Sequence, residues 1–262
     1  MSGFKKQYFY LVKLQYLGYR FHGWQKQPNL KTLHLMVDKT LRYVLNDKPF
    51  KTLVAGRTDA MVSANETAFE LFLEEDLEDV SAFLDWFNYN LPQDLRALSL
   101  EPVDKSFNII QHSKQKEYLY IFAHGGKYHP FCAPFMTTIL DTLDINVMQQ
   151  GAKLFEGTHN FKPYCYKPTE KGEYIRTIDL CELVENNVIT ANFMPETSYL
   201  LRVVGKGFMR NQIRLIMGAL IQLGKGKMTL SDIETSLKPD SNVTMQFIAP
   251  PSGLILHTIN FE

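Results

Sequence analysis

The sequence predicts an α+β fold made of two related units, each a mainly antiparallel sheet with helices on one face, around a central basic cleft. Strand-like segments alternate with segments of helical periodicity along the 262 residues. Neighbouring strand segments are joined closely enough to pair in antiparallel fashion. The strand–loop–helix order of residues 8–45 is also weakly similar to that of residues 198–224. We therefore expect an N-terminal domain over residues 1–105 and a C-terminal domain over residues 106–262.

The first domain is expected to start with a strand at 8–16, because aromatic and β-branched residues dominate YFYLVKLQY. A loop follows, and Thr32 is the expected N-cap of a helix whose apolar residues recur with helical spacing as far as Leu45. The other expected elements of this domain are strands at 52–56, 67–73 and 95–103 and a helix at 79–91 that Pro92 stops.

The second domain is expected to start with a strand at 117–124 that ends at the Gly125-Gly126 turn. Segments 174–184 and 188–194 flank Glu185-Asn186-Asn187, a pattern that predicts a hairpin. The other expected elements are helices at 144–157, 208–224 and 230–237 and strands at 198–205 and 253–261.

Charge is distributed unevenly, although the formal net charge is zero. Residues 1–37 carry six Lys or Arg and no Asp or Glu, and residues 197–231 carry six more, again without an acid. Residues 66–104 hold eleven acids and one base. Two basic segments with aromatic side chains nearby could form a cleft that binds phosphates and stacks bases, or could be ordinary solubilising surface. Charge alone leaves both interpretations open.

The chain has three cysteines, which are too scattered for a zinc site or a disulfide framework and fit a reducing cytosol: Cys132, Cys165 and Cys181. The aromatic run near the N-terminus is too short and interrupted for a signal peptide. No stretch is long enough to span a bilayer. We therefore expect a cytoplasmic protein with no membrane association and no metal site.

The stretch AGRTDAM, residues 55–61, places Arg57, Thr58 and Asp59 behind a glycine and a short apolar run. One interpretation is a turn in which the Thr or Asp side chain bonds the backbone. The other is an active site, since an ionised carboxylate can serve as nucleophile or base. A second segment adds cations, because Arg210 and Arg214 are four residues apart and share one face of the expected 208–224 helix. In isolation, the turn is the better-supported interpretation of residues 57–59.

Several motifs, in order along the chain, resemble those of the TruA family of tRNA pseudouridine synthases. YLGYRFHGWQ (16–25) is similar to the family's aromatic-rich strand and loop, and AGRTDA (55–60) to its catalytic motif. FMRNQIRLIMG (208–218) closely matches the family's helix pattern Phe-x-x-(His/Asn)-x-(Val/Ile)-Arg-x-x-(Val/Met)-Gly. Further family segments are resembled by LPQDLR (91–96), EYLYIF (117–122) and APPSGLIL (249–256). The resemblance runs nearly end to end and outweighs the interpretation of a turn alone.

This resemblance implies an isomerase that converts uridine to pseudouridine in the anticodon stem-loop of tRNA, in the region of nucleotides 38 to 40. Asp59 falls on the catalytic aspartate, Tyr118 on the active-site tyrosine, and Arg214 on the arginine that pairs with the aspartate. The target uridine is flipped out of its stack, because its glycosidic bond cannot be reached inside a helix. The family needs no metal or redox cofactor and forms a homodimer with tRNA across both subunits.

RNA contacts are expected from Arg57, which would help occupy the space left by the flipped base, and from the two basic segments. The further candidates on those segments are Arg20, Trp24, Gln25, Lys26, Lys206, Phe208 and Arg210.

The sequence departs from the family pattern at several places. Met61 and Ser63 stand where glycine and histidine are common, and glycine often marks special backbone torsions. Lys116 and Glu117 stand where the family often has an arginine before the tyrosine. His34 and Leu35 replace a glutamine-rich start of the first helix, and Asn108-Ile109 replaces an expected Ala-Arg. These departures concern RNA-contacting regions and so bear on substrate choice.

Three alternatives remain beside the main hypothesis. The same isomerisation could act on another RNA or another tRNA position. A non-catalytic RNA-binding relative would be expected to have lost Asp59, Tyr118 or Arg214, and all three are present. A glycoside-cleaving hydrolase would need a second carboxylate as partner of Asp59, and none stands out in a neighbouring loop.

Overall fold

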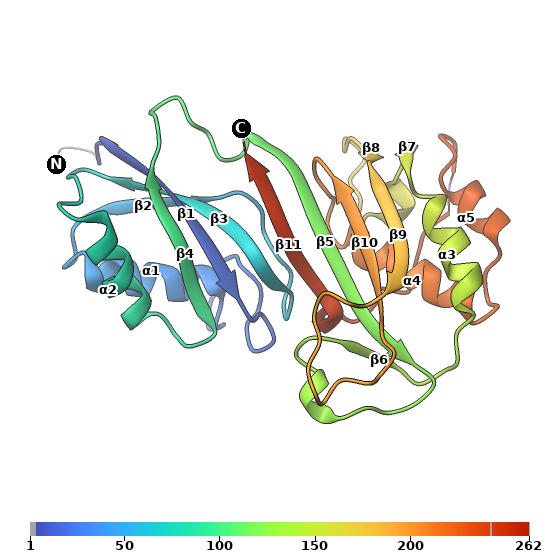
Figure 1. Cartoon of the computed structure of the whole chain (residues 1–262). Coiled ribbons are helices and arrows are strands. Elements are labelled where there is room, and N and C mark those ends of the chain that lie inside the picture. The colour runs from blue at the N-terminus through green and yellow to red at the C-terminus, as the bar shows by residue number, and fades with distance from the viewer. Residues whose placement is uncertain (1–3, 242, 262) are drawn as a thin grey trace. The chain divides into compact units, whose positions relative to one another are not determined.

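The structure is a computed structural model that describes residues 4–241 and 243–261 (Figure 1). The chain divides into two compact units. The N-terminal unit comprises Met1–Lys114 with Leu256–Glu262, and the C-terminal unit comprises Gln115–Ile255. The sequence predicted 1–105 and 106–262, and the difference at the end of the chain arises because strand β11 (Leu254–Phe261) pairs with β3 (Ser63–Leu73). The predicted α+β class is confirmed.

The sheet of the N-terminal unit has the strand order β4-β1-β3-β11, and β2 also pairs with β3. Pairings of β1 with β3, β1 with β4 and β2 with β3 are all antiparallel. The bounds of the strands not yet given are β1 Tyr8–Tyr16, β2 Phe50–Val54 and β4 Leu95–Pro102. The predicted strands agree with these within a few residues, which is the usual uncertainty of element ends.

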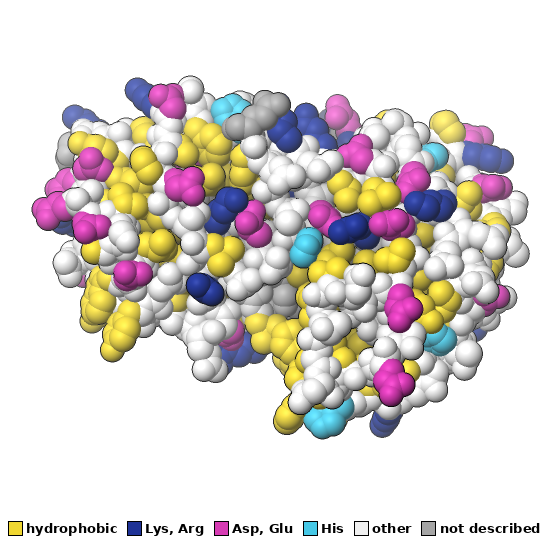
Figure 2. Space-filling model, in the orientation of Figure 1, with side chains coloured by type: hydrophobic (Ala, Val, Ile, Leu, Met, Phe, Trp, Pro, Cys, Tyr) yellow, Lys and Arg dark blue, Asp and Glu magenta, His cyan; other side chains and the backbone are white. Residues whose placement is uncertain are grey.

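Two helices, α1 (Leu33–Val44) and α2 (Val80–Asn90), lie on one side of this sheet (Figure 1). Each begins where the sequence predicts, because the Thr32 and Asp79 side chains accept hydrogen bonds from the third backbone N–H of their helices, at 3.4 and 2.9 Å. The outward side of α2 is apolar in part, since Trp86 and Tyr89 are 45% and 82% exposed and stack on one another. Figure 2 shows hydrophobic side chains gathered over this helix.

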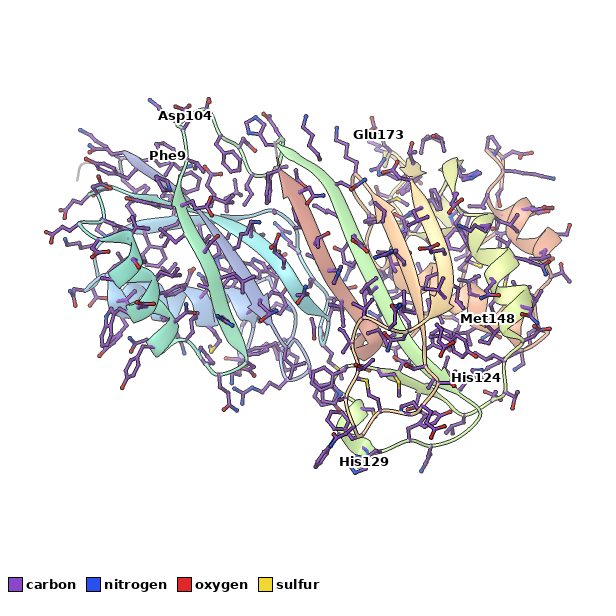
Figure 3. All side chains as sticks on the ribbon, in the orientation of Figure 1. Phe9, Asp104, His124, His129, Met148 and Glu173 are labelled. Carbon is purple, nitrogen blue, oxygen red and sulfur yellow. The ribbon has the colours of Figure 1, made fainter. Side chains whose placement is uncertain are left out.

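The opposite face of the same sheet is covered by the chain that follows β4. Ile109 in this segment is fully buried, and its N–H donates to the carboxylate of Glu70, which is 2% exposed. Phe9 packs edge-on against Phe72 on this face, and Asp104 caps the turn that starts the covering segment (Figure 3). Burial raises the pKa of Glu70, while the Ile109 N–H opposes the rise.

The C-terminal unit has the antiparallel strand order β5-β10-β9, and β6 pairs with β5 in parallel. Strands β7 and β8 form a separate antiparallel pair. The strand bounds are β5 Ser113–His124, β6 Thr137–Ile139, β7 Gly157–Asn160, β8 Ile175–Ile178, β9 Leu180–Glu185 and β10 Tyr199–Gly205. The helices are α3 (Ile145–Lys153), α4 (Gln212–Gly224) and α5 (Leu230–Ser236).

Strand β5 presents different side chains to its two faces, because alternate residues point to opposite sides of a strand. Leu119, Ile121 and Ala123 belong to one buried cluster, against which Phe193 and Met194 of the β9–β10 connection pack. Tyr118 and its alternate neighbours on β5 therefore point to the other face. Among the described residues, no helix is long and apolar enough to cross a membrane.

Three expected elements are wrong in detail. The strand predicted over residues 174–184 is divided into β8 and β9, which belong to different sheets. Residues 188–194 form no strand, because the Asn186 side chain accepts from the N–H groups of Val188 and Ile189 and donates to the Ser198 hydroxyl. Strand β9 pairs with β10 instead of forming a hairpin with that segment. Helix α4 begins at Gln212 rather than Phe208, because Asn211 adopts φ +57°, which a right-handed helix cannot continue.

We expect Glu70→Gln to raise the free energy of unfolding at pH 7 by about 1 kcal/mol, because the amide avoids the cost of burying a charge. A carboxyl with a raised folded-state pKa binds its proton more tightly in the folded protein, so wild-type stability falls as pH rises above about 4.5. The advantage of the variant should therefore shrink towards pH 4, as urea denaturation would measure. The exposed Glu75→Gln is the control and should change little; a variant less stable than wild type at pH 7 would contradict the prediction.

Candidate active site

The Asp59 side chain lies in the loop that connects β2 and β3, in the N-terminal unit. The loop begins where the Ala55 N–H donates to the Ala68 carbonyl at 3.0 Å and closes where the Val62 N–H donates to the Asp59 carbonyl at 3.2 Å. Residues 59–62 thus form a turn that is closed by backbone atoms, whereas the predicted turn at residues 57–59 was to be closed by the Thr58 or Asp59 side chain. Asp59 itself is half-buried, whereas Arg57 is exposed and Thr58 is buried.

A second segment, residues 21–24, holds this turn by its backbone. The Trp24 N–H donates to the Thr58 carbonyl at 3.1 Å, and the Met61 N–H donates to the Phe21 carbonyl at 3.0 Å. The Tyr16 hydroxyl, at the end of β1, is 2.8 Å from the Thr58 hydroxyl in a buried contact. Asp59 is therefore flanked on both sides by backbone that is hydrogen-bonded to another part of the unit, which holds the position of its Cα atom.

Gly23 makes this close approach possible. Its φ is +81°, and a Cβ atom at this position would lie 2.8 Å from the Thr58 carbonyl oxygen. Both the torsion and the space favour glycine. The glycine of the Gly-Trp-Gln motif thus serves the Asp59 turn rather than its own loop.

Met61 has φ +66°, in the left-handed region. The backbone torsion for which glycine is suited therefore persists at this position, although the residue is methionine. Ser63, the other departure in this stretch, accepts a hydrogen bond from the Gly18 N–H at 2.9 Å. Both residues take part in the local geometry of the turn.

The structure brings several of the expected RNA-binding residues together around the 23–26 loop. The Arg57 guanidinium donates to the Gln25 side-chain oxygen at 2.8 Å. Lys26 forms an ion pair with Asp38 on α1. Arg20 forms a two-pronged ion pair with Asp94 of the LPQDLR segment, so two motifs distant in sequence meet.

Trp24 differs from the expectation of direct RNA contact. Its indole is 2% exposed and lies between Tyr16 and His34, with ring centroids 6.3 and 5.7 Å away. It supports the 23–26 loop from inside the unit, and little of its surface is exposed. His34 is neutral at physiological pH, because burial and the nearby Lys26 and Arg57 charges lower its pKa to about 4.

A hollow of about 280 Å³ opens beside these groups. Because His34 is neutral, the positive charge at this hollow comes from Lys26 and Arg57. Its lining residues are Trp24, Gln25, Lys26, His34, Thr52, Leu53, Val54 and Arg57. The sequence did not predict that His34, Thr52 and Asp38 lie among the residues at or beside this hollow. The departure from the family pattern at His34 was the one feature of the sequence that could have indicated it.

In the C-terminal unit, the structure brings together Tyr118 and Phe208, and it places Arg214 near Tyr120 of the same strand. The rings of Tyr118 and Phe208 pack edge to face with centroids 5.4 Å apart. Arg214, near the start of α4, donates to the Ala249 carbonyl at 2.8 Å and lies close enough to Tyr120, two residues along β5, to affect its pKa. Tyr118 and Tyr120 share a face of that strand.

The departures before Tyr118 have separate roles. Lys116 lies on the same face of β5 as Tyr118, and burial lowers the pKa of its ammonium group. Glu117 points to the other face, where it accepts a hydrogen bond from Arg202 at 2.6 Å. Lys116 is thus the cation that stands near the tyrosine where the family often has arginine. Lys206 and Arg210, on the turn before α4, are exposed.

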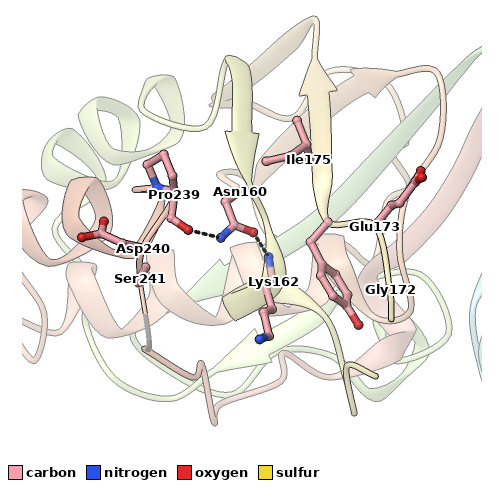
Figure 4. A pocket seen from close by; sticks show the side chains of 9 residues that line it. Asn160, Lys162, Gly172, Glu173, Ile175, Pro239, Asp240 and Ser241 are labelled. Carbon is pink, nitrogen blue, oxygen red and sulfur yellow. Dashed lines mark hydrogen bonds between the residues drawn. The ribbon is translucent and has the colours of Figure 1, made fainter. Parts of the chain in front are cut away.

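Other groups show no comparable arrangement. His124 and His129, at the end of β5 and in the loop beyond it (Figure 3), accept backbone N–H bonds from Leu143 and Phe131. Within the parts of the chain that the structure describes, no group of three or more His, Cys, Asp or Glu is placed to hold a metal ion. A pocket of about 480 Å³ between the β7–β8 pair and residues 239–241 contains neither Tyr118 nor Arg214 (Figure 4).

Comparison with known proteins agrees with the motifs. A family model described as tRNA pseudouridine synthase matches residues 152–262. The chain is similar to tRNA pseudouridine synthase A of Exiguobacterium sp., with 30% identity over 94% of this chain and 95% of that protein. It is 28% identical to the Listeria monocytogenes protein of the same name, over 97% and 99% of the two chains.

Among solved structures, an archaeal box H/ACA sRNP Nop10-Cbf5 complex matches with a TM-score of 0.33 and 12% identity. The match covers 89% of this chain and 64% of that chain, and it is too weak to support an argument.

The α+β fold and these matches define an isomerase of the pseudouridine synthase class. More narrowly, the chain belongs to the TruA family of tRNA pseudouridine synthases.

We expect Met61→Gly to leave activity and stability close to wild type, because two effects oppose each other. Glycine adopts φ +66° without strain, which stabilises the folded state, but it also raises the conformational entropy of the unfolded chain. Met61→Val should lower the free energy of unfolding by about 1–2 kcal/mol and reduce activity, because a β-branched residue is strained there. Thermal denaturation and initial rates on a uridine-containing substrate would measure both. If valine were tolerated as well as glycine, the torsion would not matter to the turn.

Proposed function

We propose that the protein isomerises uridine to pseudouridine in the anticodon stem-loop of tRNA, in the region of nucleotides 38 to 40, and that Asp59 starts the reaction. The observation that carries the proposal is the Asp59 turn, in which the half-buried Asp59 lies between Thr58 and Met61, and the backbone of these two residues is hydrogen-bonded to residues 24 and 21. Relatives named tRNA pseudouridine synthase A, aligned over nearly the whole chain, support the substrate class.

The reaction conserves all atoms and electrons. The N1–C1′ bond of the target nucleotide breaks, the uracil rotates while held, and a bond forms between C5 and C1′. The proton on C5 is lost, and N1 takes up a proton. Asp59 would start this sequence, by attack on the sugar or the base or by assisting formation of a glycal. Each of these routes needs a carboxylate with a fixed direction.

Tyr118 and Arg214 have complementary proposed roles. The Tyr118 ring, steadied by Phe208 at 5.4 Å, would stack on the flipped uracil, and its hydroxyl would help remove the C5 proton. Arg214 is held by the Ala249 carbonyl and would keep Asp59 charged and oriented. These assignments rest on the motif positions together with the contacts within the C-terminal unit.

The exposed cations would bind the RNA backbone. Arg57, Gln25 and Lys26 adjoin the Asp59 turn, and Arg57 would help fill the space that the flipped base leaves. Arg20, Lys206, Phe208 and Arg210 would supply further contacts, whereas Trp24 would act by supporting the 23–26 loop. We further propose that the protein acts in the cytoplasm as a homodimer, with tRNA lying across both subunits. If sedimentation in the presence of tRNA showed the protein to be a monomer, the proposed homodimer would be refuted.

Asp59→Asn should lower the turnover number by roughly 10³-fold or more, because it removes the charge and leaves the shape. The measurement is pseudouridine formation in a tRNA transcript and, in cells lacking the gene, in total tRNA. The exposed carboxylate of α2, in Asp85→Asn, is the matched control and should have wild-type activity. Anticodon-arm uridines that stay modified without the protein, together with no conversion by the purified protein, would refute the function.

Tyr118→Phe should separate the two roles of the tyrosine. The phenyl ring keeps the edge-to-face contact with Phe208, so KM should change little, while loss of the hydroxyl should lower kcat by roughly 10²-fold or more. Tyr118→Ala removes the ring as well and should also raise KM. Equal activity of the phenylalanine variant and wild type would exclude the hydroxyl from proton removal.

A further inference from the structure

Four side chains of the C-terminal unit lie close together, although they come from a loop, a strand and a turn. The loop of residues 165–174 joins the short helical turn Lys162–Tyr164 to β8, and it carries Tyr166 and Lys167. Arg176 lies on β8, and Arg210 lies on the turn that precedes α4. We call Tyr166, Lys167, Arg176 and Arg210 the Tyr166 cluster.

The contacts within the cluster bring cations onto one aromatic ring. The Arg210 guanidinium lies 5.0 Å from the Tyr166 ring centroid, and the Lys167 ammonium lies 5.3 Å from it. The backbone joins the same partners, because the Tyr166 N–H donates to the Arg210 carbonyl at 3.0 Å. The ring thus restrains two long cationic side chains that would otherwise sample many rotamers in solvent.

Arg176 belongs to the same group of charges. Burial raises the pKa of the Cys165 thiol, and the guanidinium charges of Arg176 and Arg210 both act against this rise. Both arginines therefore lie near the residue that precedes Tyr166. Arg176 is half-buried and fixed, since it donates to the Ile175 carbonyl at 2.7 Å.

The base of the loop is anchored in the core. Tyr164 is fully buried, packs edge-on against Phe155 and is 2.7 Å from the Ser236 hydroxyl. The Pro163 carbonyl accepts from the Met245 N–H at 3.2 Å. Tyr166 and Lys167 are therefore carried by a loop whose start is held in the core.

Lys167 shows backbone strain. Its φ is +52°, and it directly precedes Pro168, which disfavours helical torsions in the residue before it. Such strain costs on the order of 1–3 kcal/mol and is concentrated at ligand-binding sites. The torsion turns the lysine to the side where Tyr166 and Arg210 lie, as the 5.3 Å contact shows.

The positive charge of the cluster is not neutralised locally. Among residues 4–241 and 243–261, no carboxylate lies within ion-pair distance of Lys167, Arg176 or Arg210. Glu173, a carboxylate of the same loop, lines the pocket of about 480 Å³ described above and forms no ion pair with the cluster (Figure 4). Three cations without carboxylate partners, one of them strained and two of them placed over a ring, indicate an anionic ligand.

The position of the cluster indicates which anion. Arg210 is two residues from Phe208, whose ring contacts Tyr118. A nucleotide held against Tyr118 is joined to its two neighbours in the RNA through phosphates. Because Phe208 contacts Tyr118, we expect one side of this RNA strand to run past the 206–211 turn that carries Phe208 and Arg210.

We propose that the Tyr166 cluster binds backbone phosphates of the RNA substrate beside the nucleotide held at Tyr118, with Tyr166 as a positioning residue for Lys167 and Arg210. This inference rests on the proposed function for its ligand, and it assigns Tyr166, Lys167 and Arg176 to a second part of the RNA-binding surface.

The test is the salt dependence of RNA binding, because each phosphate contact contributes about −0.9 for duplex, or −0.7 for single strands, to the slope of log K against log salt. We would measure binding of an anticodon-arm transcript by the full chain between 50 and 300 mM KCl. Lys167→Gln and Arg176→Gln should each weaken binding roughly 3- to 10-fold at moderate salt and make the slope shallower by about 1.

Tyr166 has its own pair of variants. Tyr166→Phe keeps the ring and should bind like wild type, whereas Tyr166→Leu should weaken binding and make the slope shallower, because Lys167 and Arg210 lose their platform. Lys153→Gln is the matched control, since Lys153 is an exposed lysine of the same unit that already pairs with Glu156. Circular dichroism would confirm that the leucine variant is folded, and the two glutamine variants test the site independently of it.

Each result has one meaning. Wild-type slopes in both glutamine variants would overturn the inference, even if the enzyme makes pseudouridine. Shallower slopes in these variants, with no pseudouridine formed by wild type, would support the phosphate site and refute the proposed function. Absence of RNA binding by wild type would overturn both.

Discussion

The hydrogen bonds between residues 21–24 and the Asp59 turn are the constraint on which the candidate site depends. A turn between two strands is normally free to adjust, and a carboxylate on it would sample several directions. Here Trp24 and Met61 join the two segments by backbone N–H bonds of 3.1 and 3.0 Å. Gly23 is what lets the two backbones approach, and the Tyr16 hydroxyl adds a buried side-chain contact. The backbone on both sides of Asp59 is thereby held in place by its neighbours.

This arrangement also explains why aromatic residues surround a polar site. Trp24 is inside the unit, between Tyr16 and a neutral His34, and it holds the loop that carries Gln25 and Lys26. The polar residues at the surface are directed by apolar contacts beneath them. The C-terminal unit uses the same principle, because Phe208 steadies Tyr118 and the Tyr166 ring restrains cations.

Three departures from the family pattern, Met61, Ser63 and Lys116, take part in the local structure around the candidate site residues. Met61 adopts the torsion that suits glycine, Ser63 accepts a backbone N–H from Gly18, and Lys116 puts a cation on the Tyr118 face of β5. None of them removes a group on which the proposed chemistry depends. Their cost is in stability and in the chemistry of RNA contact, where lysine and arginine differ in geometry.

The sequence by itself determined the class of fold, most of the elements and their order, and the family. Periodicity, capping residues such as Thr32 and Asp79, and motif order are local properties, and local physics decides them. The tertiary structure alone decided that Trp24 is buried, that Arg20 meets Asp94, that β11 joins the first unit and that residues 188–194 pack as a loop instead of pairing. Each of these depends on contacts between segments far apart in the chain, whose burial and hydrogen-bond gains outweigh the local preference and leave no periodic signal in sequence.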